Sequence, residues 1–384
     1  MNTQNAPVHI RLWHRNFWLM VVANFLLSVS VTMLIPTLPQ RMLYVDGLSA
    51  AQTGWVMGVF ALGMFLPGAF CSFLVQRFRR NQVCVWAVLV LGATLFVPYY
   101  WRVMPFWALM LLRLVQGASF GLAQMVLSST LIIDTCDSAQ RTEANHSATW
   151  FGRLALSIGP MVGLLVFQLM GYGIMALTGL GCLAAVVVLI LMVHFPFRVP
   201  EDHLHLLSLD RFFLTSGWVL FGNLLLVSVG LGLLFSLVLD AQFYALMMIG
   251  FLLALMAQTF VFRDADLKSE VVSGLLLMGA SVLVMRFAPE SPLGSPMLGL
   301  GIGLVGSRFL LFFIKLSRHC QRGTSQSTFL LGWESGVAVG IGLGYLLFDS
   351  RRNELLWCSF SLLMLALFVY VTFVHGWFIR HRNR

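Results

Sequence analysis

The sequence predicts an all-α integral membrane protein with twelve transmembrane helices in two six-helix bundles. Of its 384 residues, 59% are hydrophobic and 10% are charged, whereas soluble domains carry roughly 25% charged residues. The charged residues fall in short islands, and the apolar runs between them are long enough to cross a bilayer. The two halves also share a weak internal repeat. These observations exclude a soluble globular protein with a large core.

Splitting the chain at its charged islands gives twelve apolar runs, most of which have the roughly 17–25 residues that a spanning helix needs. They form an N-terminal bundle (1–195) and a C-terminal bundle (212–384), joined by a polar linker (196–211). The first run has no small-residue cleavage site after it, so we expect it to remain as the first span. The runs are 17–38, 53–75, 83–100, 105–133, 148–170, 174–195, 212–237, 243–262, 271–287, 297–316, 329–347 and 355–377.

Most Lys and Arg residues fall on alternate loops, including the loop with Arg77, Arg79 and Arg80. Because basic residues favour the cytoplasmic side, this asymmetry predicts that both termini are cytoplasmic in a cell (inner or plasma) membrane. It also explains the net charge of +9 without a nucleic-acid partner.

The repeat relates the two halves in parallel, with two sets of matches in the same order. Such units, related by an axis along the membrane normal, are typical of transporters, with the substrate site at their interface. The first set matches Trp18, Asn24 and Ser28 to Trp218, Asn223 and Ser228, and the second matches Gln140, Arg141, Asn145 and Gly152 to Gln321, Arg322, Gln326 and Gly332.

Arg113 lies inside the fourth apolar run. Its guanidinium cannot be deprotonated, so it must face a wet cavity or a partner, and such residues often mark a transport path. Gln116 lies one turn later on the same helical face, and Gly117 allows a neighbouring helix to approach closely. A structural role, in which Arg113 only bonds backbone carbonyls, remains the alternative.

Three motifs resemble those of the major facilitator superfamily, and the resemblance covers essentially the whole chain. Arg113-Leu-Val-Gln116-Gly117 resembles the fourth-helix R-x-x-Q-G signature. Gly159-Pro160-Met-Val-Gly163 resembles the fifth-helix G-P-x-x-G motif of proton-coupled exporters, although Leu164 stands where the family usually has a further glycine after Gly163. The loop with Arg77, Arg79 and Arg80 occupies the place of G-x-x-x-D-R-x-G-R-R, but Ser72, Gln76 and Arg79 replace the first glycine, the aspartate and the second glycine.

The resemblance implies a cavity lined by the first, fourth, seventh and tenth helices. Arg308 of the tenth span and Arg113 are then expected to make the cavity cationic, which favours anionic or zwitterionic cargo; neutralisation of one arginine by Glu334 is the alternative. Glu334 in the eleventh span is a candidate proton-coupling carboxylate, because an ionised carboxylate is costly there. A salt bridge to a neighbouring helix is its alternative role. Arg153 matches the repeat position next to Glu334 and is expected to pack where the halves meet.

Polar and small residues within the spans complete the predicted site. Asn24, Gln116, Gln124 and Asn223 are candidates for the substrate cavity, with bonding between helices as the alternative. Gly152, Gly159, Pro160 and Gly163 recur on one face of the fifth span, either to seal or flex that helix during transport or simply to pack it.

A cytoplasmic latch is also predicted. The acidic loop with Asp264 and Asp266 faces the basic loop with Arg77, Arg79 and Arg80 across the pseudo-two-fold, so the two loops are expected to pair when the cytoplasmic side closes. The alternative is that all of these charges are solvated.

The sequence therefore favours a secondary active transporter of small organic molecules that works by alternating access, in the form of proton-coupled export. An uptake porter or facilitator for a sugar, organic acid or peptide-like anion, and a transport-dead receptor or scaffold, are the alternatives. No nucleophile–base pair, metal-spaced cluster or phosphate loop suggests an enzyme or a cofactor. The expected partners are the lipid bilayer, a small-molecule substrate and protons, and the chain is expected to be a monomer.

Overall fold

The computed structural model describes residues 12–101, 103–137, 140–195, 206–209, 211–260, 266–318 and 321–382. Within these ranges the chain is helical almost throughout. The first half contains α1 (Arg15–Thr32), α2 (Leu34–Tyr44), α3 (Ala50–Phe65), α4 (Gly68–Arg77), α5 (Arg80–Tyr100), α6 (Phe106–Val126), the π-helix η1 (Leu127–Leu131), α7 (Ile132–Asp134) and α8 (Arg141–Leu191). The second half contains the 3₁₀ helix η3 (Thr215–Gly217), α9 (Trp218–Leu237), α10 (Ala241–Phe260), α11 (Leu267–Phe287), α12 (Gly294–Leu316), α13 (Arg322–Leu347), α14 (Arg352–Val369), the π-helix η5 (Tyr370–Val374) and α15 (His375–His381).

In the part of the chain that the structure describes, ten helices are long and apolar enough to cross a membrane, or eleven if α3 and α4 form one span bent by 46°. One of the ten, α8, has 51 residues, which is too long for a single crossing. It is interrupted at Gly171, where φ is +83° and the helical geometry breaks. Divided there, α8 supplies the fifth and sixth predicted runs. The all-α membrane fold expected from the sequence is confirmed.

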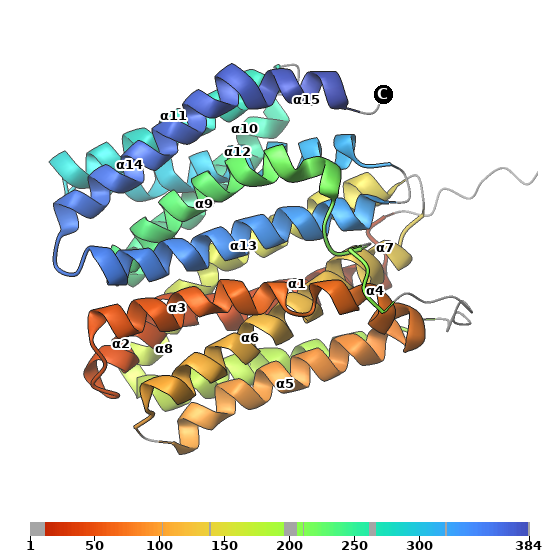
Figure 1. Ribbon diagram of the computed structural model, residues 1–384, viewed down its shortest axis with the longest axis horizontal. Helices are drawn as coiled ribbons and strands as arrows, with labels where there is room; N and C mark the ends of the chain where they lie inside the picture. The colour runs from red at the N-terminus through yellow and green to blue at the C-terminus, as the bar shows by residue number, and fades with distance from the viewer. Residues whose placement is uncertain are drawn as a thin grey trace, which may run out of the picture.

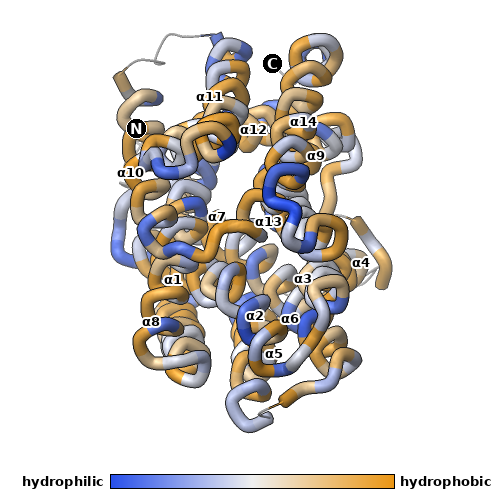
Figure 2. Tube along the Cα trace, turned by 90° about the vertical axis from the view of Figure 1, so that its left-hand side faces the viewer, coloured by the Kyte–Doolittle hydropathy of each residue, from blue (hydrophilic) through white to orange (hydrophobic). Residues whose placement is uncertain are grey.

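The helices run side by side along one axis in two groups (Figure 1). The helices α1–α8 form the lower group and α9–α15 the upper, and the end-on view in Figure 2 shows the same division. We call these groups the N-half and the C-half. The exact domain boundary stays a prediction, because most of the linker 196–211 lies outside the described residues.

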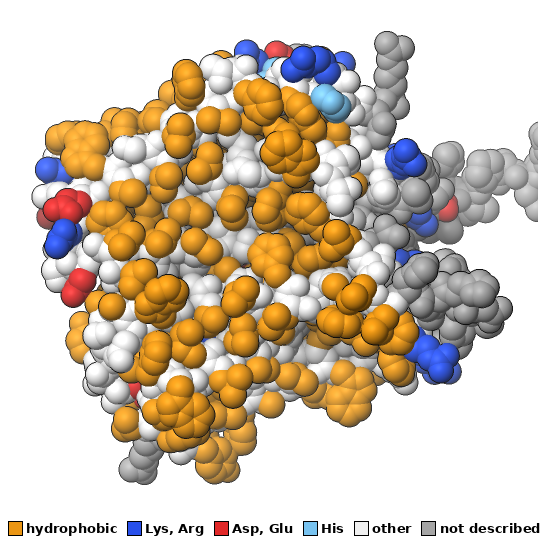
Figure 3. Space-filling model, in the orientation of Figure 1, with side chains coloured by type: hydrophobic (Ala, Val, Ile, Leu, Met, Phe, Trp, Pro, Cys, Tyr) orange, Lys and Arg blue, Asp and Glu red, His pale blue; other side chains and the backbone are white. Residues whose placement is uncertain are grey.

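Apolar side chains cover the middle of the face shown in Figure 3, while Lys and Arg gather near its ends. Exposed residues include large side chains such as Trp86, Trp107 and Phe368. An apolar belt between charged ends suits a bilayer. The end at which α1 and α13 begin carries Arg77, Arg80 and Arg322, and we call it the basic end; it is the end that the sequence predicts to be cytoplasmic.

Small residues allow close helix packing inside each half. A Cβ on Gly117 of α6 would stand 3.0 Å from the Cα of Gly63 on α3, so these helices approach at their backbones. In the C-half, a Cβ on Gly232 of α9 would stand 2.8 Å from the Cα of Gly340 on α13. Glycine pairs of this kind bring membrane helices within backbone contact.

The helix α13 connects the halves at both ends. Opposite the basic end, a Cβ on Gly342 would stand 2.8 Å from the carbonyl oxygen of Gly54 in α3. At the basic end, a Cβ on Gly323 would stand 2.5 Å from the carbonyl oxygen of Ser129 in η1. The remaining polar surface of α13 therefore lies between these contacts, against the N-half.

Candidate functional site between the two halves

A polar cavity lies between α13 and the N-half. Its volume is about 20 Å³, room for about one water molecule. The helices α1, α6 and α8 supply one wall, and α13 alone supplies the other. The lining residues are Asn24, Ser28, Gln124, Thr149, Gly152, Arg153, Leu156, Gln326, Phe329, Leu330, Trp333 and Glu334.

Arg153 is the most unusual member of this set. Its side chain is buried, and Nε, Nη1 and Nη2 have no hydrogen-bond partner. The guanidinium lies 5.2 Å from the ring centre of Trp150 and 5.6 Å from that of Phe329. Aromatic rings stabilise a cation partly, but they leave its N–H donors unsatisfied. Arg153 therefore presents a planar, five-donor fork to the cavity.

The helix α12 packs against Arg153, and the absence of a side chain at Gly306 leaves space for the guanidinium. A Cβ on Gly306 would stand 2.8 Å from Nε of Arg153, so only glycine leaves that side of the guanidinium free. The sequence predicted that Arg153 packs where the halves meet but did not assign it to the cavity. A signal was present, because Arg153 precedes Glu334 by the same interval that relates Asn145 to Gln326.

Glu334 lies in the same cavity, on α13. Its carboxylate has no hydrogen bond or ion pair with any residue that the structure describes, and no ion pair joins it to Arg153. The salt bridge considered as an alternative for Glu334 is therefore absent within the described ranges. The ring of Trp333, next to Glu334, stacks on that of Phe329 with centroids 6.2 Å apart, which gives the α13 wall an aromatic surface.

Unpartnered polar atoms surround the two charges. Asn24 donates from Nδ2 to the carbonyl oxygen of Ala148 over 3.3 Å, while its Oδ1 has no partner. Gln326 donates from Nε2 to Oγ1 of Thr149 over 3.3 Å, across the halves, while its Oε1 has no partner. The hydroxyl of Ser28 also lacks one. Such atoms are rare in protein interiors and indicate a site that a ligand or water completes.

The two arginines expected in the cavity lie elsewhere. Arg113 is buried within the N-half, where Nη1 donates to Oε1 of Gln116 over 3.0 Å and the guanidinium lies 4.2 Å from the ring centre of Phe60. Neither Arg113 nor Gln116 lines the cavity. The helical rotation of α6 directs Gln124 to the cavity instead.

Arg308 forms an ion pair with Glu270 of α11, inside the C-half. Gln258 of α10 donates to the same carboxylate over 2.7 Å and bonds Ser307. Arg308 is therefore neutralised by Glu270 and not by Glu334. Arg113 and Arg308 therefore do not line this cavity; its basic side chain is Arg153 and its acidic side chain is Glu334.

Asn223 does not line the cavity, although its repeat partner Asn24 does. It is buried in the C-half and donates from Nδ2 to the carbonyl oxygen of Ala366 in α14 over 3.0 Å. This hydrogen bond joins two helices of the C-half, which is the alternative role for Asn223.

The small residues of α8 divide into two groups. A Cβ on Gly159 would stand 3.1 Å from the carbonyl oxygen of Val29, and one on Gly163 would stand 2.9 Å from that of Met33. Both glycines therefore pack closely on the C-terminal end of α1. Pro160 is buried beside them. Gly152 differs, since a Cβ there would meet Nδ2 of Asn24 at an ordinary 3.6 Å. Gly152 therefore lines the cavity without being required for close packing.

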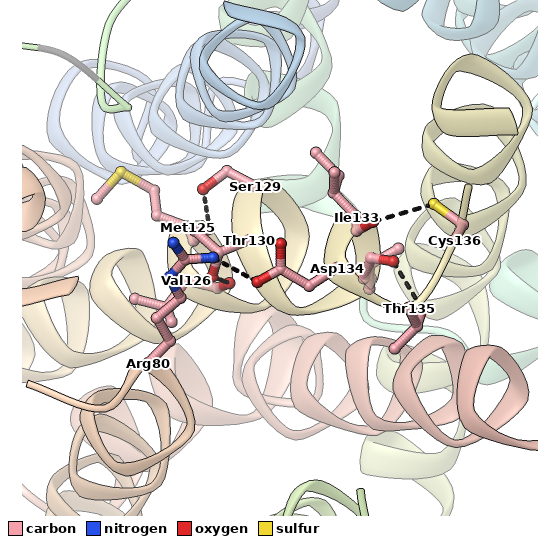
Figure 4. A network of polar contacts seen from close by, with 10 residues as sticks. Arg80, Met125, Val126, Ser129, Thr130, Ile133, Asp134, Thr135 and Cys136 are labelled. Atoms are coloured by element: carbon pink, nitrogen blue, oxygen red, sulfur yellow. Dashed lines mark hydrogen bonds and ion pairs between the residues drawn. The ribbon is translucent and has the colours of Figure 1, made fainter. Parts of the chain in front are cut away.

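At the basic end, Arg80 of α5 forms an ion pair with Asp134, at the end of α7 (Figure 4). Both residues belong to the N-half. Asp264 lies outside the described residues, and Asp266 is the N-cap residue of α11. The latch between the acidic loop and Arg77, Arg79 and Arg80 therefore stays a prediction, with Arg80 paired inside its own half in this conformation.

The Arg80–Asp134 ion pair lies at the end of the segment formed by η1 and α7, and η1 is a π-helical turn. In η1, the hydroxyls of Ser129 and Thr130 donate to the carbonyl oxygens of Met125 and Val126, one turn back (Figure 4). A π-helical turn with such back-bonding bends more readily than a regular α-helix. Gln124 lines the cavity and lies just before this turn, and Ser129 within the turn contacts Gly323 of α13. The turn therefore lies between the cavity and that contact.

The fold matches those of known transporters. Solved structures that align over nearly the whole chain include the nucleoside transporter NupG (15% identity, 93% of this chain and 99% of that one, TM-score 0.64), the human organic anion transporter MFSD10 (16%, 92% and 98%, 0.67) and the POT family transporter PepTSo (13%, 96% and 99%, 0.70). At these identities the likeness concerns the fold. A sequence model described as Major Facilitator Superfamily matches residues 20–341. The chain therefore belongs to the major facilitator superfamily of membrane transporters.

Proposed function

We propose that the protein is a secondary active transporter that exports a small organic molecule by alternating access, driven by protons. The observation that carries the proposal is a cavity between the halves that holds Arg153, whose guanidinium is buried without a hydrogen-bond partner, and the half-buried Glu334, which forms no ion pair in the described residues. Buried charges without partners are costly, so a chain retains them where a ligand or a proton completes them.

Each charge has a separate role in this proposal. Arg153 keeps its charge under all conditions and binds the substrate. Glu334 either ionises or takes up a proton, which removes the cost of a charge in a poorly solvated cavity. Proton uptake at Glu334 then competes with binding of a cationic group there. This competition couples the proton gradient to substrate movement, because each side of the membrane favours a different occupant.

The glycine contacts of α13 supply the alternation. The contacts of Gly342 with Gly54 and of Gly323 with Ser129 lie on opposite sides of the cavity. Opening one while the other holds exposes the cavity to one side at a time. We further propose that the protein acts as a monomer in the inner or plasma membrane, with the basic end and both termini in the cytoplasm.

The test is transport in proteoliposomes with an imposed pH gradient, assayed against a panel of neutral, anionic, cationic and zwitterionic compounds. Wild-type protein should accumulate at least one compound, in the direction that corresponds to export. Glu334→Gln should abolish gradient-driven accumulation while retaining exchange of the same compound. Gradient-driven accumulation by Glu334→Gln at the wild-type level would refute the coupling role, and an inward direction would indicate uptake.

A further inference from the structure

The charges of the cavity are opposite in sign and come from opposite halves. Arg153 projects from α8 and Glu334 from α13, and both line one cavity without forming an ion pair. A purely anionic ligand would satisfy Arg153 and leave Glu334 unpaired, and a purely cationic ligand would do the reverse. While Glu334 is ionised, only a ligand with both charges satisfies both side chains, and leaving either charge unpaired in a poorly solvated site is costly.

We infer, on the basis of the transport function proposed above, that the substrate is a small zwitterion with an apolar body. Its carboxylate is bound by the guanidinium of Arg153, whose planar fork matches two carboxylate oxygens. Its ammonium group is bound by the carboxylate of Glu334. The acceptors Asn24 Oδ1 and Gln326 Oε1, which have no partner in the structure, are available to further N–H groups of the ligand.

The walls between the charges indicate the apolar body. Phe329 and Trp333 stack along α13. Leu156 and Leu330 complete this surface. The cavity holds about one water molecule in this conformation, so a larger ligand enters only when a contact of α13 opens and the walls separate. An aromatic amino acid or a short peptide with an aromatic residue combines the two charges with such a body. A sugar has neither charge, and an organic acid lacks the cation.

The experiment measures binding to the purified full-length protein by thermal shift, since a ligand stabilises the folded state that binds it. The probes are L-phenylalanine, N-acetyl-L-phenylalanine (anion only), L-phenylalanine amide (cation only) and the dipeptide L-alanyl-L-phenylalanine. We expect a zwitterionic probe to bind at least about tenfold more tightly than either singly charged analogue, because each analogue loses one charge-assisted contact. The ammonium and carboxylate groups lie closer together in L-phenylalanine than in the dipeptide, so comparing these two probes shows which charge separation the site prefers.

The variants assign each charge to its partner. In Arg153→Gln, the preference for the zwitterion over the amide should disappear. In Glu334→Gln, the preference for the zwitterion over the N-acetyl compound should disappear. Arg153→Lys keeps the charge but loses the fork, so it should retain part of the preference and shows that the site still folds. Asn223→Ala, which removes a buried amide outside the cavity, should keep the wild-type preference.

Three results would overturn the inference. The first is a singly charged analogue that binds wild-type protein as tightly as the zwitterions do. The second is the absence of binding by either zwitterion at millimolar concentration. The third is wild-type binding by Arg153→Gln/Glu334→Gln, which would show that the charges serve only each other. If the proteoliposomes still accumulate another compound, only the zwitterion inference fails; if they accumulate nothing, the proposed transport fails as well.

Discussion

The N-half and the C-half use repeat-related positions differently. The interval of 181 residues that relates Gln140, Arg141 and Asn145 to Gln321, Arg322 and Gln326 also relates Arg153 to Glu334. The equivalent positions thus carry opposite charges and face one cavity. Asn24 and Asn223 show the same divergence, since the first lines the cavity and the second bonds the backbone of α14. A symmetric fold therefore holds an asymmetric site.

The difference extends to whole helices. Three helices of the N-half contribute to the cavity, whereas α13 alone contributes from the C-half. In the C-half, a Cβ on Gly336 of α13 would stand 2.5 Å from Cβ of Ser228, so α9 and α13 are in close contact. In the N-half, the repeat-related Ser28 of α1 lines the cavity instead. Close packing of α9 excludes its polar residues from the site. The C-half lines the cavity through one helix, which also contacts the N-half at both ends.

The largest expected effect comes from removing the cation of the N-half. Arg153→Met replaces an unpaired buried charge with an apolar side chain, so thermal stability should be unchanged or higher. Transport should fall by about 100-fold, equivalent to about 2.7 kcal/mol of lost binding, because substrate contacts to the guanidinium disappear. Thermal unfolding and proteoliposome transport measure the two effects. A large loss of stability with normal transport would instead assign Arg153 a structural role.

The next effect tests α13 as the connecting helix. Gly342→Ala and Gly323→Ala each introduce a Cβ against backbone of the N-half, which cannot move aside cheaply. Each should disfavour closure at its own end, shifting the population of conformations by about tenfold for a cost of about 1.4 kcal/mol. Distances between spin labels on the two halves should lengthen at opposite ends in the two variants. Equal effects of both variants at one end would contradict this assignment.

A smaller effect separates the repeat-related amides. Asn24→Ala should weaken substrate binding several-fold, because Asn24 presents Oδ1 to the cavity. Asn223→Ala should leave transport near normal and lower stability by about 0.6 kcal/mol, the average for hydrogen bonds between membrane helices, whose largest values are about 1.7 kcal/mol. Equilibrium binding and unfolding measured on both variants give the comparison. The asymmetry of the site would be disproved if Asn223→Ala weakened binding as much as Asn24→Ala.

The smallest effect concerns the space beside Arg153. Gly306→Ala places a Cβ against the flexible end of that side chain, which can shift, so folding should be preserved. Substrate binding should weaken by about two- to threefold, as the guanidinium moves from its position by a few tenths of an ångström. Gly222→Ala, at a position where a Cβ meets open space, is the matched control and should bind as wild type. Identical affinities of the two variants would show that Arg153 does not need this position.

The sequence by itself determined the fold class and the family. Runs of apolar residues bounded by charged islands require helices in a bilayer, because backbone groups must be satisfied internally there. The R-x-x-Q-G motif at Arg113 and the G-P-x-x-G motif at Gly159 pointed to the superfamily that the family comparison then confirmed. Of the residues assigned to the site, Asn24, Gln124, Gly152 and Glu334 line the cavity.

The tertiary structure decided which charges meet. Arg113, Arg153 and Arg308 all lie within apolar spans, and composition does not distinguish them. A helix repeats every 3.6 residues, so its rotation about its own axis selects the residues that face a neighbour. That rotation results from packing of the whole bundle. It places Arg308 against Glu270, Arg113 against Gln116, and Arg153 with Glu334 around one cavity.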